Sequence, residues 1–454
     1  MRDEEIQPDT RTLSNLVFAC LFTLLTCLWC CIRPDVPSPQ DSRLRILFTK
    51  LNIIFWVLVS PEMVAFWSFR QWFEAGRIAE EFKSKKHLCF FPLLPYLSDR
   101  GWTRRHALFL LMGGFMLCEN GQPIQTLSIP QFRRLLQRGA IDFPSTTISE
   151  IKERGSLHPT FAFLVILQVT WFTTQCLSRL AKGLVITQLE ALTLVLLLMN
   201  VIILVFAYQK PLDARYPIQI NIKFDVDPHL GEPTPRTVRA DFKREKEIED
   251  IAKRIFLVEH RSQSQPLMTV GHFIYHVLKF TFIWPIRSMY RDFGYLAINM
   301  ESNEIPRGSL KVPFFYVPDS SDLLLCVLPA VTLLGVGVGV VSCLFWSWGH
   351  FPSDVARLVW RVSSVTTAAF CALFLVLITF ISLTQMWSQA ALSGLVEMIA
   401  DLCIYVGVFI FLIALIPYIV ARVIVLLESF VCLQSLPPEA FRIVPWTNYI
   451  PHFA

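Results

Sequence analysis

Long apolar runs, separated by polar segments of very different lengths, dominate the pattern of this chain. Seven of these runs are long enough to cross a hydrocarbon layer of about 30 Å as helices, which takes roughly 20 residues each. The predicted spans are 15–32, 51–69, 160–178, 184–207, 323–348, 362–386 and 403–427. The pattern therefore predicts an all-α fold, a polytopic membrane helix bundle that forms a single integral membrane domain.

Two polar regions, 70–159 and 209–322, interrupt the apolar runs and carry many Lys and Arg residues. We expect both on the cytosolic side, with amphipathic or re-entrant segments inside them. The apolar stretch 107–118 is too short to span and predicts an interfacial, re-entrant or buried segment. Further on, 240–261 predicts a solvated charged helix and 270–296 a helix that lies in the interface.

The hairpin formed by 160–178 and 184–207 carries one polar stripe on each helix, with a spacing of three to four residues. The stripes comprise Gln168, Trp171, Gln175 and Arg179 in the first helix and Thr187, Glu190, Thr193 and Asn200 in the second. Facing lipid, these groups would lack hydrogen-bond partners, at a cost of several kcal/mol per group. They are therefore expected to bond the two helices to each other or to face a substrate site.

The run 51–69 contains Ser60-Pro61-Glu62 near its middle. Proline removes a backbone donor, so a kink is expected there. Glu62 then lies at membrane depth beside loosened backbone. It is either a structural acid that is protonated or paired, or a proton donor, a cation stabiliser or an ion site.

Composition supports a membrane protein, since 54% of the residues are hydrophobic and only 17% are charged. Soluble proteins carry roughly 25% charged residues. The net charge of +5 is small for 454 residues, and the basic residues lie almost wholly outside the apolar runs. They indicate topology rather than nucleic-acid binding. Their distribution predicts a cytosolic N-terminus and a C-terminus on the opposite side of an endomembrane or the plasma membrane.

The sequence lacks the motifs of several kinds of enzyme chemistry. The sequence contains neither the phosphate-binding loop GxxxxGK[ST] nor the hydrolase motif GxSxG. His272 and His276 form one HxxxH pair, but membrane di-iron oxygenases need several such pairs. Close acidic pairs are present without the DDxxD pattern of diphosphate chemistry, and the cysteines show no zinc or disulfide framework. We therefore expect no metal and no cofactor.

Short motifs along nearly the whole chain resemble those of a known protein family. They include Arg33-Pro34-Asp35-Val36-Pro37, Met112-Gly113-Gly114-Phe115, Trp171-Phe172-Thr173-Thr174-Gln175-Cys176, Ile186-Thr187-Gln188-Leu189-Glu190, Lys210-Pro211-Leu212-Asp213 and Val312-Pro313-Phe314-Phe315-Tyr316. Their order resembles that of a large family of fungal multi-span integral membrane proteins that has no established activity. The chain departs from that family at Ser342-Cys343, where the family usually has His-Cys.

Two functional hypotheses follow from different classes. The first is an intramembrane enzyme of secondary metabolism, a cyclase or isomerase for a small hydrophobic metabolite, with Glu62 and Glu190 as catalytic acid or base. Aromatic faces attract the cations that such reactions develop. The predicted substrate-binding residues are Trp56, Gln168, Trp171, Phe172, Gln175, Thr187 and Asn200.

The alternative hypothesis is a transporter, channel or receptor-like protein in which the same groups line a path for a small molecule or an ion. A structural scaffold is third. In every case the expected partners are the lipid bilayer and, for the first two hypotheses, a small ligand.

Overall fold

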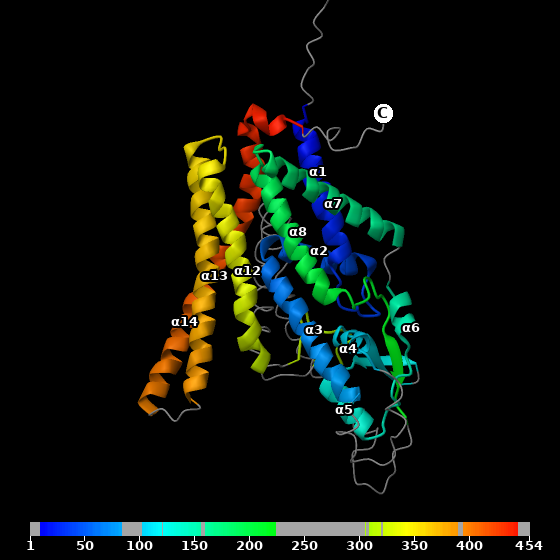
Figure 1. The fold of residues 1–454 in the computed structure, drawn as a ribbon. Coiled ribbons are helices and arrows are strands. Elements are labelled where there is room, and N and C mark those ends of the chain that lie inside the picture. Colours follow the sequence, from blue (N-terminus) through cyan, green and yellow to red (C-terminus); the bar gives the residue numbers. More distant parts are fainter. Residues whose placement is uncertain are drawn as a thin grey trace, which may run out of the picture.

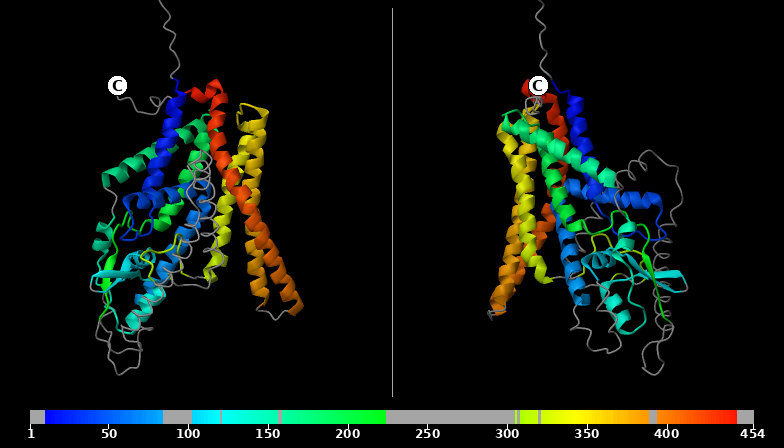
Figure 2. Two further views of the ribbon diagram at one scale, coloured as in Figure 1. Left: turned by 180° about the vertical axis from the view of Figure 1, so that it is seen from behind. Right: turned by 45° about the vertical axis from the view of Figure 1, so that its right-hand side comes forward.

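The computed structural model describes residues 10–83, 102–119, 121–155, 159–223, 305, 308–318, 321–388 and 394–443. Long helices make up most of this part of the chain, and a smaller polar domain packs against one end of them (Figures 1 and 2). The helices predicted for 240–261 and 270–296 and the His272/His276 pair lie outside the described residues.

Within the described residues, five helices are long and apolar enough to cross a membrane. They are α1 (Leu13–Cys31), α7 (Pro159–Ala181), α8 (Gln188–Ala207), α13 (Asp354–Ser388) and α14 (Gly394–Val431). A further long helix, α12 (Ser321–Trp348), contains the shorter apolar stretch Thr332–Ser347 and packs on α13. The chain is therefore a multi-pass membrane protein.

The kink expected at Ser60-Pro61 is a complete break between α2 (Arg43–Val59) and α3 (Pro61–Lys83). The axes of the two helices are bent by 117° at this break. Pro61 has no amide proton, and the Ser60 amide closes α2 on the carbonyl of Trp56. The predicted span 51–69 is thus not one helix. If the bent pair counts as one span, the described chain has six candidate spans, against the predicted seven.

The two ends of the described chain meet. Thr10 forms a β-bridge with Arg442, and the amide of Arg11 donates to the carbonyl of Phe441 over 2.8 Å. The six helices α1, α7, α8, α12, α13 and α14 run alternately away from and back towards this meeting point, whereas the polar domain lies at the other end of α8 (Figures 1 and 2). Thr10 and Arg442 therefore lie together, whereas the sequence analysis expects the two ends of the chain on opposite sides of the membrane.

The polar domain contains a small sheet, so the prediction of an all-α fold is wrong in detail. Strand β1 (Phe115–Glu119) pairs antiparallel with β2 (Gln122–Thr126) and parallel with β3 (Ile218–Asn221), which gives the order β2-β1-β3. Gly113 adopts a φ of +81° that favours glycine. This residue ends the helical part of the stretch 107–118 and turns the chain into β1.

Three short helices complete this domain: α4 (Arg104–Leu111), α5 (Ile129–Gln137) and α6 (Ile148–Glu153). Its core stacks aromatic rings, with Trp102 and Phe132 at a centroid distance of 5.6 Å. The stretch 107–118 belongs to this core and is almost wholly buried. Of the three alternatives predicted for it, the buried segment is therefore the observed one.

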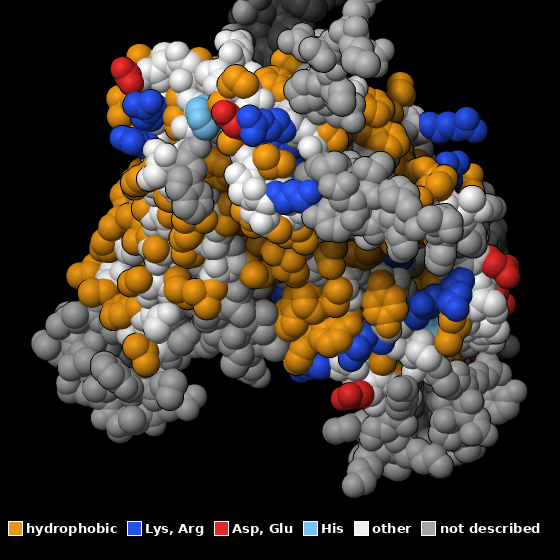
Figure 3. All heavy atoms as spheres, turned by 45° about the horizontal axis from the view of Figure 1, so that its top comes forward, with side chains coloured by type: hydrophobic (Ala, Val, Ile, Leu, Met, Phe, Trp, Pro, Cys, Tyr) orange, Lys and Arg blue, Asp and Glu red, His pale blue; other side chains and the backbone are white. Residues whose placement is uncertain are grey.

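The outer faces of the long helices are largely hydrophobic (Figure 3). Exposed side chains on α7, α8 and α14 include Phe163, Leu198 and Phe409, each more than half exposed. Such continuous apolar surface is unfavourable in water and matches lipid tails. The helices thus imply association with a lipid bilayer.

Candidate functional site

A groove of about 380 Å³ lies between α1 and α7. Four of the predicted substrate-binding residues line it together: Gln168, Trp171, Phe172 and Gln175. The remaining lining residues are Arg11, Asn15, Leu16, Phe18, Ala19, Phe22, Arg179 and Ile443. Its wall is thus mainly apolar, with three amides along it and two arginines.

The path of α7 explains why its polar stripe meets α1. Figure 1 shows α7 crossing α1 obliquely and diverging from α8. The side-chain amide of Gln168 donates to the hydroxyl of Thr23 on α1 over 2.8 Å. Asn200, on the stripe of α8, donates to the carbonyl of Leu196 in its own helix over 2.8 Å. In these contacts the stripes do not bond the two helices of the hairpin to each other.

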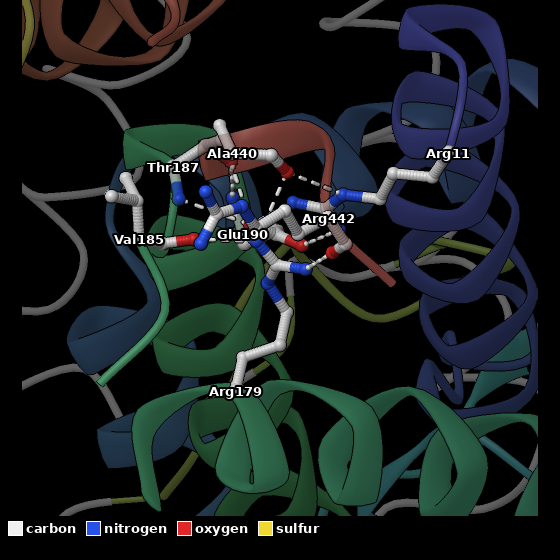
Figure 4. A network of polar contacts seen from close by, with 7 residues as sticks. All are labelled: Arg11, Arg179, Val185, Thr187, Glu190, Ala440 and Arg442. Atoms are coloured by element: carbon white, nitrogen blue, oxygen red, sulfur yellow. Dashed lines mark hydrogen bonds and ion pairs between the residues drawn. The ribbon is translucent and has the colours of Figure 1, made fainter. Parts of the chain in front are cut away.

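The cationic end of the groove is built from distant parts of the chain (Figure 4). Both terminal nitrogens of the Arg11 guanidinium bind the carboxylate of Glu190, one of them over 3.1 Å. Arg179 donates to the carbonyls of Val185 over 2.8 Å, Ala440 over 2.9 Å and Arg442 over 2.6 Å. This end of the groove therefore holds two guanidinium groups and one carboxylate, which leaves it positive.

One donor at this end lacks an acceptor. The side chain of Arg179 is only 3% exposed, yet its Nε has no hydrogen-bond partner among the residues that the structure describes. A buried unsatisfied donor costs about 1–3 kcal/mol, more for a charged group. An acceptor supplied by a ligand would remove that cost.

Glu190 also caps α8. The Thr187 amide donates to its carboxylate over 3.0 Å, and the Glu190 amide donates to the Thr187 hydroxyl over 3.2 Å. This reciprocal arrangement is a capping box, and a carboxylate at a helix N-terminus also interacts favourably with the helix dipole. The predicted acid thus lies behind the groove, bonded to Arg11, rather than in its wall.

Glu62 lies away from the groove, in the centre of the helix bundle. Its carboxylate accepts from Arg422 over 2.8 Å and from the hydroxyl of Tyr418, both on α14, and from Ser60 at the helix break over 3.2 Å. Glu62 and Arg422 are both buried. Gly335 makes room for the pair, because a Cβ there would lie 3.2 Å from the Cγ of Glu62.

The remaining predicted residues do not join the groove. Trp56 is 1% exposed and packs in the core of the bundle, and Asn200 is fully buried along α8. The predicted set therefore divides between the groove, its cationic end and the interior of the bundle.

Two arginines complete these sites, and the sequence prediction did not pair them. Arg422 is the one basic residue inside the apolar run 403–427, so it required a buried acidic partner. That signal indicates an acidic partner but does not identify Glu62, which lies 360 positions away. Arg11 precedes the first apolar run and gave no comparable signal, because its partner is 179 positions away.

The groove offers binding groups rather than a metal centre. Among the described residues, no group of three or more His, Cys, Asp or Glu side chains lies close enough together to hold a metal ion. Its apolar wall, its amides and its positive end together suit an amphipathic molecule with an acidic head.

Comparison with known proteins identifies a family. No curated protein and no solved structure matches the chain. A family model matches residues 4–231 and 322–453, which is most of the sequence and includes both arginine–glutamate pairs. The chain therefore belongs to DUF8562, a family of unknown function.

Proposed function

We propose that this membrane protein binds a small amphipathic molecule, with an acidic head and an apolar body, in the groove between α1 and α7. The observation that carries the proposal is the buried Arg179, whose Nε lacks an acceptor among the described residues at the positive end of a mainly apolar groove. A carboxylate or phosphate is the natural acceptor for a guanidinium group.

The rest of the groove supports the same ligand. Phe172 is buried in its wall, and Trp171 remains 48% exposed, which leaves aromatic surface for an apolar body. Burying such surface contributes about 25 cal/mol per Å². The amides of Gln168 and Gln175 lie along the wall and would orient polar atoms of the ligand. The volume of about 380 Å³ falls within the usual range for small-molecule sites.

Binding is tested with purified protein in detergent and radiolabelled palmitate as the probe, beside hexadecanol, which lacks the acid. We expect saturable palmitate binding that hexadecanol does not displace. Trp171→Ala should weaken palmitate binding roughly tenfold, since aromatic contacts contribute about 0.5–1.5 kcal/mol beyond the apolar area that they bury. Phe163→Ala, an exposed position on α7 outside the groove, is the matched control. Equal effects of the two variants, or no saturable binding, would refute the proposal.

The fold also supports an orientation that differs from the sequence prediction. Since 70–159 and 209–322 carry most of the basic residues, the positive-inside rule favours the polar domain in the cytosol. The clamped ends, Thr10 and Arg442, and the groove would then face the lumen or the exterior. In sealed microsomes, tags at both ends should resist added protease, and digestion of the N-terminal tag would contradict this orientation.

An enzyme is the second candidate, and one contact favours it. Glu190 is bonded to Arg11, which lines the groove, so the carboxylate is one residue away from a bound ligand. In this version the protein cyclises or isomerises a small hydrophobic secondary metabolite, with Trp171 and Phe172 facing the developing charge. Metabolite profiling of a host that expresses the native chain or Glu190→Gln tests it. A product that persists unchanged in the variant would exclude this role for Glu190.

A transporter is favoured by a different feature, the break at Ser60-Pro61. Interrupted helices with charged groups at their ends form the central sites of many transporters. Here the first turn of α3 presents Glu62 to Arg422. Flux of labelled palmitate into proteoliposomes tests transport, and binding without flux would argue against it.

A further inference from the structure

A second, larger cavity of about 630 Å³ lies where α1 and α8 end, on the side of the polar domain. Trp29 of α1, Trp67 of α3 and Asp213, which follows α8, contribute to its wall, together with the first half of α2. We propose that this cavity holds the phosphate-bearing head group of an anionic phospholipid, whose tails cover the exposed face of α2.

The charges in the cavity wall favour an anion. Five basic residues line it, against three acidic ones. The basic residues are Arg43, Arg45, Lys50, Arg215 and Lys311, and the acidic ones are Asp35, Asp41 and Asp213.

Two of the acidic groups are each neutralised by a single cation. Lys50 binds Asp213 over 3.1 Å. Asp35 is bound over 3.1 Å by Lys210, which lies outside the cavity wall. Burial raises the pKa of the Asp35 carboxyl and lowers the pKa of Lys210. Neither acid therefore opposes an incoming anion.

The third acid is shared between two cations. Asp41 binds both Arg45 and Lys311, over 3.0 and 3.4 Å. Burial raises the pKa of Asp41, but the hydrogen bond from Arg45, the charge and hydrogen bond of Lys311 and the Ser38 amide together outweigh burial, so the pKa is lowered overall. Among the described residues, Arg43 and Arg215 have no ion-pair partner. The wall therefore keeps unneutralised positive charge.

The adjoining apolar face of α2 can contact the acyl tails of the lipid. Its exposed apolar residues follow one side of the helix at intervals of three and four: Leu44, Leu47, Leu51 and Phe55, with Phe48 beside them. Since α2 is bent by 117° from α3, it lies across the long helices rather than along them (Figure 2). An apolar face on a helix of this orientation, with basic residues at its start, is typical of a helix that lies in the membrane interface.

The position of the cavity beside one leaflet of the membrane favours a lipid over a soluble phosphate compound as its ligand. With the polar domain in the cytosol, as proposed above, the cavity faces the cytosolic leaflet, where anionic lipids are concentrated. A phospholipid fills both the basic cavity and the apolar face beside it, whereas a soluble phosphate compound would leave that face uncovered.

Native mass spectrometry of the full chain released from mixed micelles tests the proposal with dioleoyl phosphatidic acid and dioleoyl phosphatidylcholine. We expect preferential retention of phosphatidic acid. Each basic group near an anionic lipid surface contributes about fivefold, so Arg43→Gln/Arg215→Gln should reduce retention by roughly thirtyfold. Both residues are exposed, and these substitutions leave the ion pairs of Asp41 and Asp213 intact.

Arg361→Gln, an exposed arginine on α13 outside the cavity, is the matched control and should keep the preference. Equal retention of the two lipids would overturn the proposal, as would a preference that the double variant retains. If glycerol 3-phosphate displaces phosphatidic acid at equal concentration, the ligand of the cavity is a soluble phosphate compound, and the proposal of a bound lipid is overturned. Palmitate binding in the groove is measured separately, so the two proposals can fail independently.

Discussion

Two carboxylates that look alike in the sequence have different surroundings in the fold. Glu62 and Glu190 both lie in apolar runs, and both bind an arginine from a distant part of the chain. Glu62 is enclosed in the centre of the bundle with Arg422, Tyr418 and Ser60. Glu190 is at the start of α8, where it caps the helix and where its partner Arg11 reaches the wall of the groove.

The difference teaches that an acidic residue at membrane depth is not by itself a catalytic signal. The pair in the bundle joins α3 to α14 across the helix break, so its first effect is on the structure. The pair at the helix start holds a cationic residue beside a ligand-sized groove. Four substitutions measure how far the two pairs differ.

The largest effect is expected for Arg422→Met. This change leaves the Glu62 carboxylate buried without its cation, and breaking a buried pair from one side costs about 3–5 kcal/mol. Thermal unfolding of the purified protein in detergent should show the loss. The double variant Glu62→Gln/Arg422→Met should recover part of the stability, because no charge remains buried. A single variant as stable as the native chain would contradict the structural role of this pair.

A smaller loss is expected for Glu190→Gln. The amide oxygen still accepts a hydrogen bond, and Arg11 is 17% exposed, so water compensates for part of the lost ion pair. Losing one charged hydrogen bond costs about 1.5–3 kcal/mol. The same variant should bind palmitate more tightly, since the end of the groove becomes more positive. Weaker palmitate binding at unchanged stability would indicate instead that Glu190 acts on the ligand directly.

Thr187→Ala isolates the contribution of the helix cap. Replacing an N-cap threonine by alanine costs about 1 kcal/mol. The measured quantity is again the unfolding temperature, beside Thr187→Ser, which keeps the hydroxyl and should be close to the native chain. If alanine and serine variants are equally stable, Glu190 is positioned by Arg11 rather than by the cap.

The smallest effect is expected for Gln168→Leu, which removes the neutral hydrogen bond to Thr23. Such interhelical bonds in membrane proteins average about 0.6 kcal/mol. A double-mutant cycle with Thr23→Val gives the coupling energy. This value is the baseline for a neutral contact in the same helices, and a coupling energy as large as that of the arginine–glutamate pairs would remove the distinction between them.

The sequence predicted the parts of the fold that depend on local spacing. The spacing of three to four residues predicted a polar face on α7, and two members of it, Gln168 and Arg179, make hydrogen bonds to other parts of the chain, whereas Trp171 remains 48% exposed. The break at Ser60-Pro61 followed from the chemistry of proline, although its size of 117° depends on the packing of α2 and α3. The sheet was missed because β1 follows a helix in one short apolar stretch.

Contacts between distant residues could not be predicted in the same way. Thr187 and Glu190 matched the capping-box spacing, but nothing in that motif identifies Arg11 as a partner. The sidedness of the loops likewise depends on packing that local spacing does not determine. The prediction counts 51–69 as a separate crossing, and without that crossing every loop that follows would lie on the opposite side.

The clamp between Thr10–Arg11 and Phe441–Arg442 has a consequence for biosynthesis. Arg11 and Ala440 are separated by 429 positions, so α1 and α7 leave the ribosome long before the carbonyls that Arg179 binds have been made. The cationic end of the groove is therefore assembled last, after α14 has inserted. Until then the guanidinium groups of a nascent chain have to find other acceptors, in water, in lipid head groups or in an insertion chaperone.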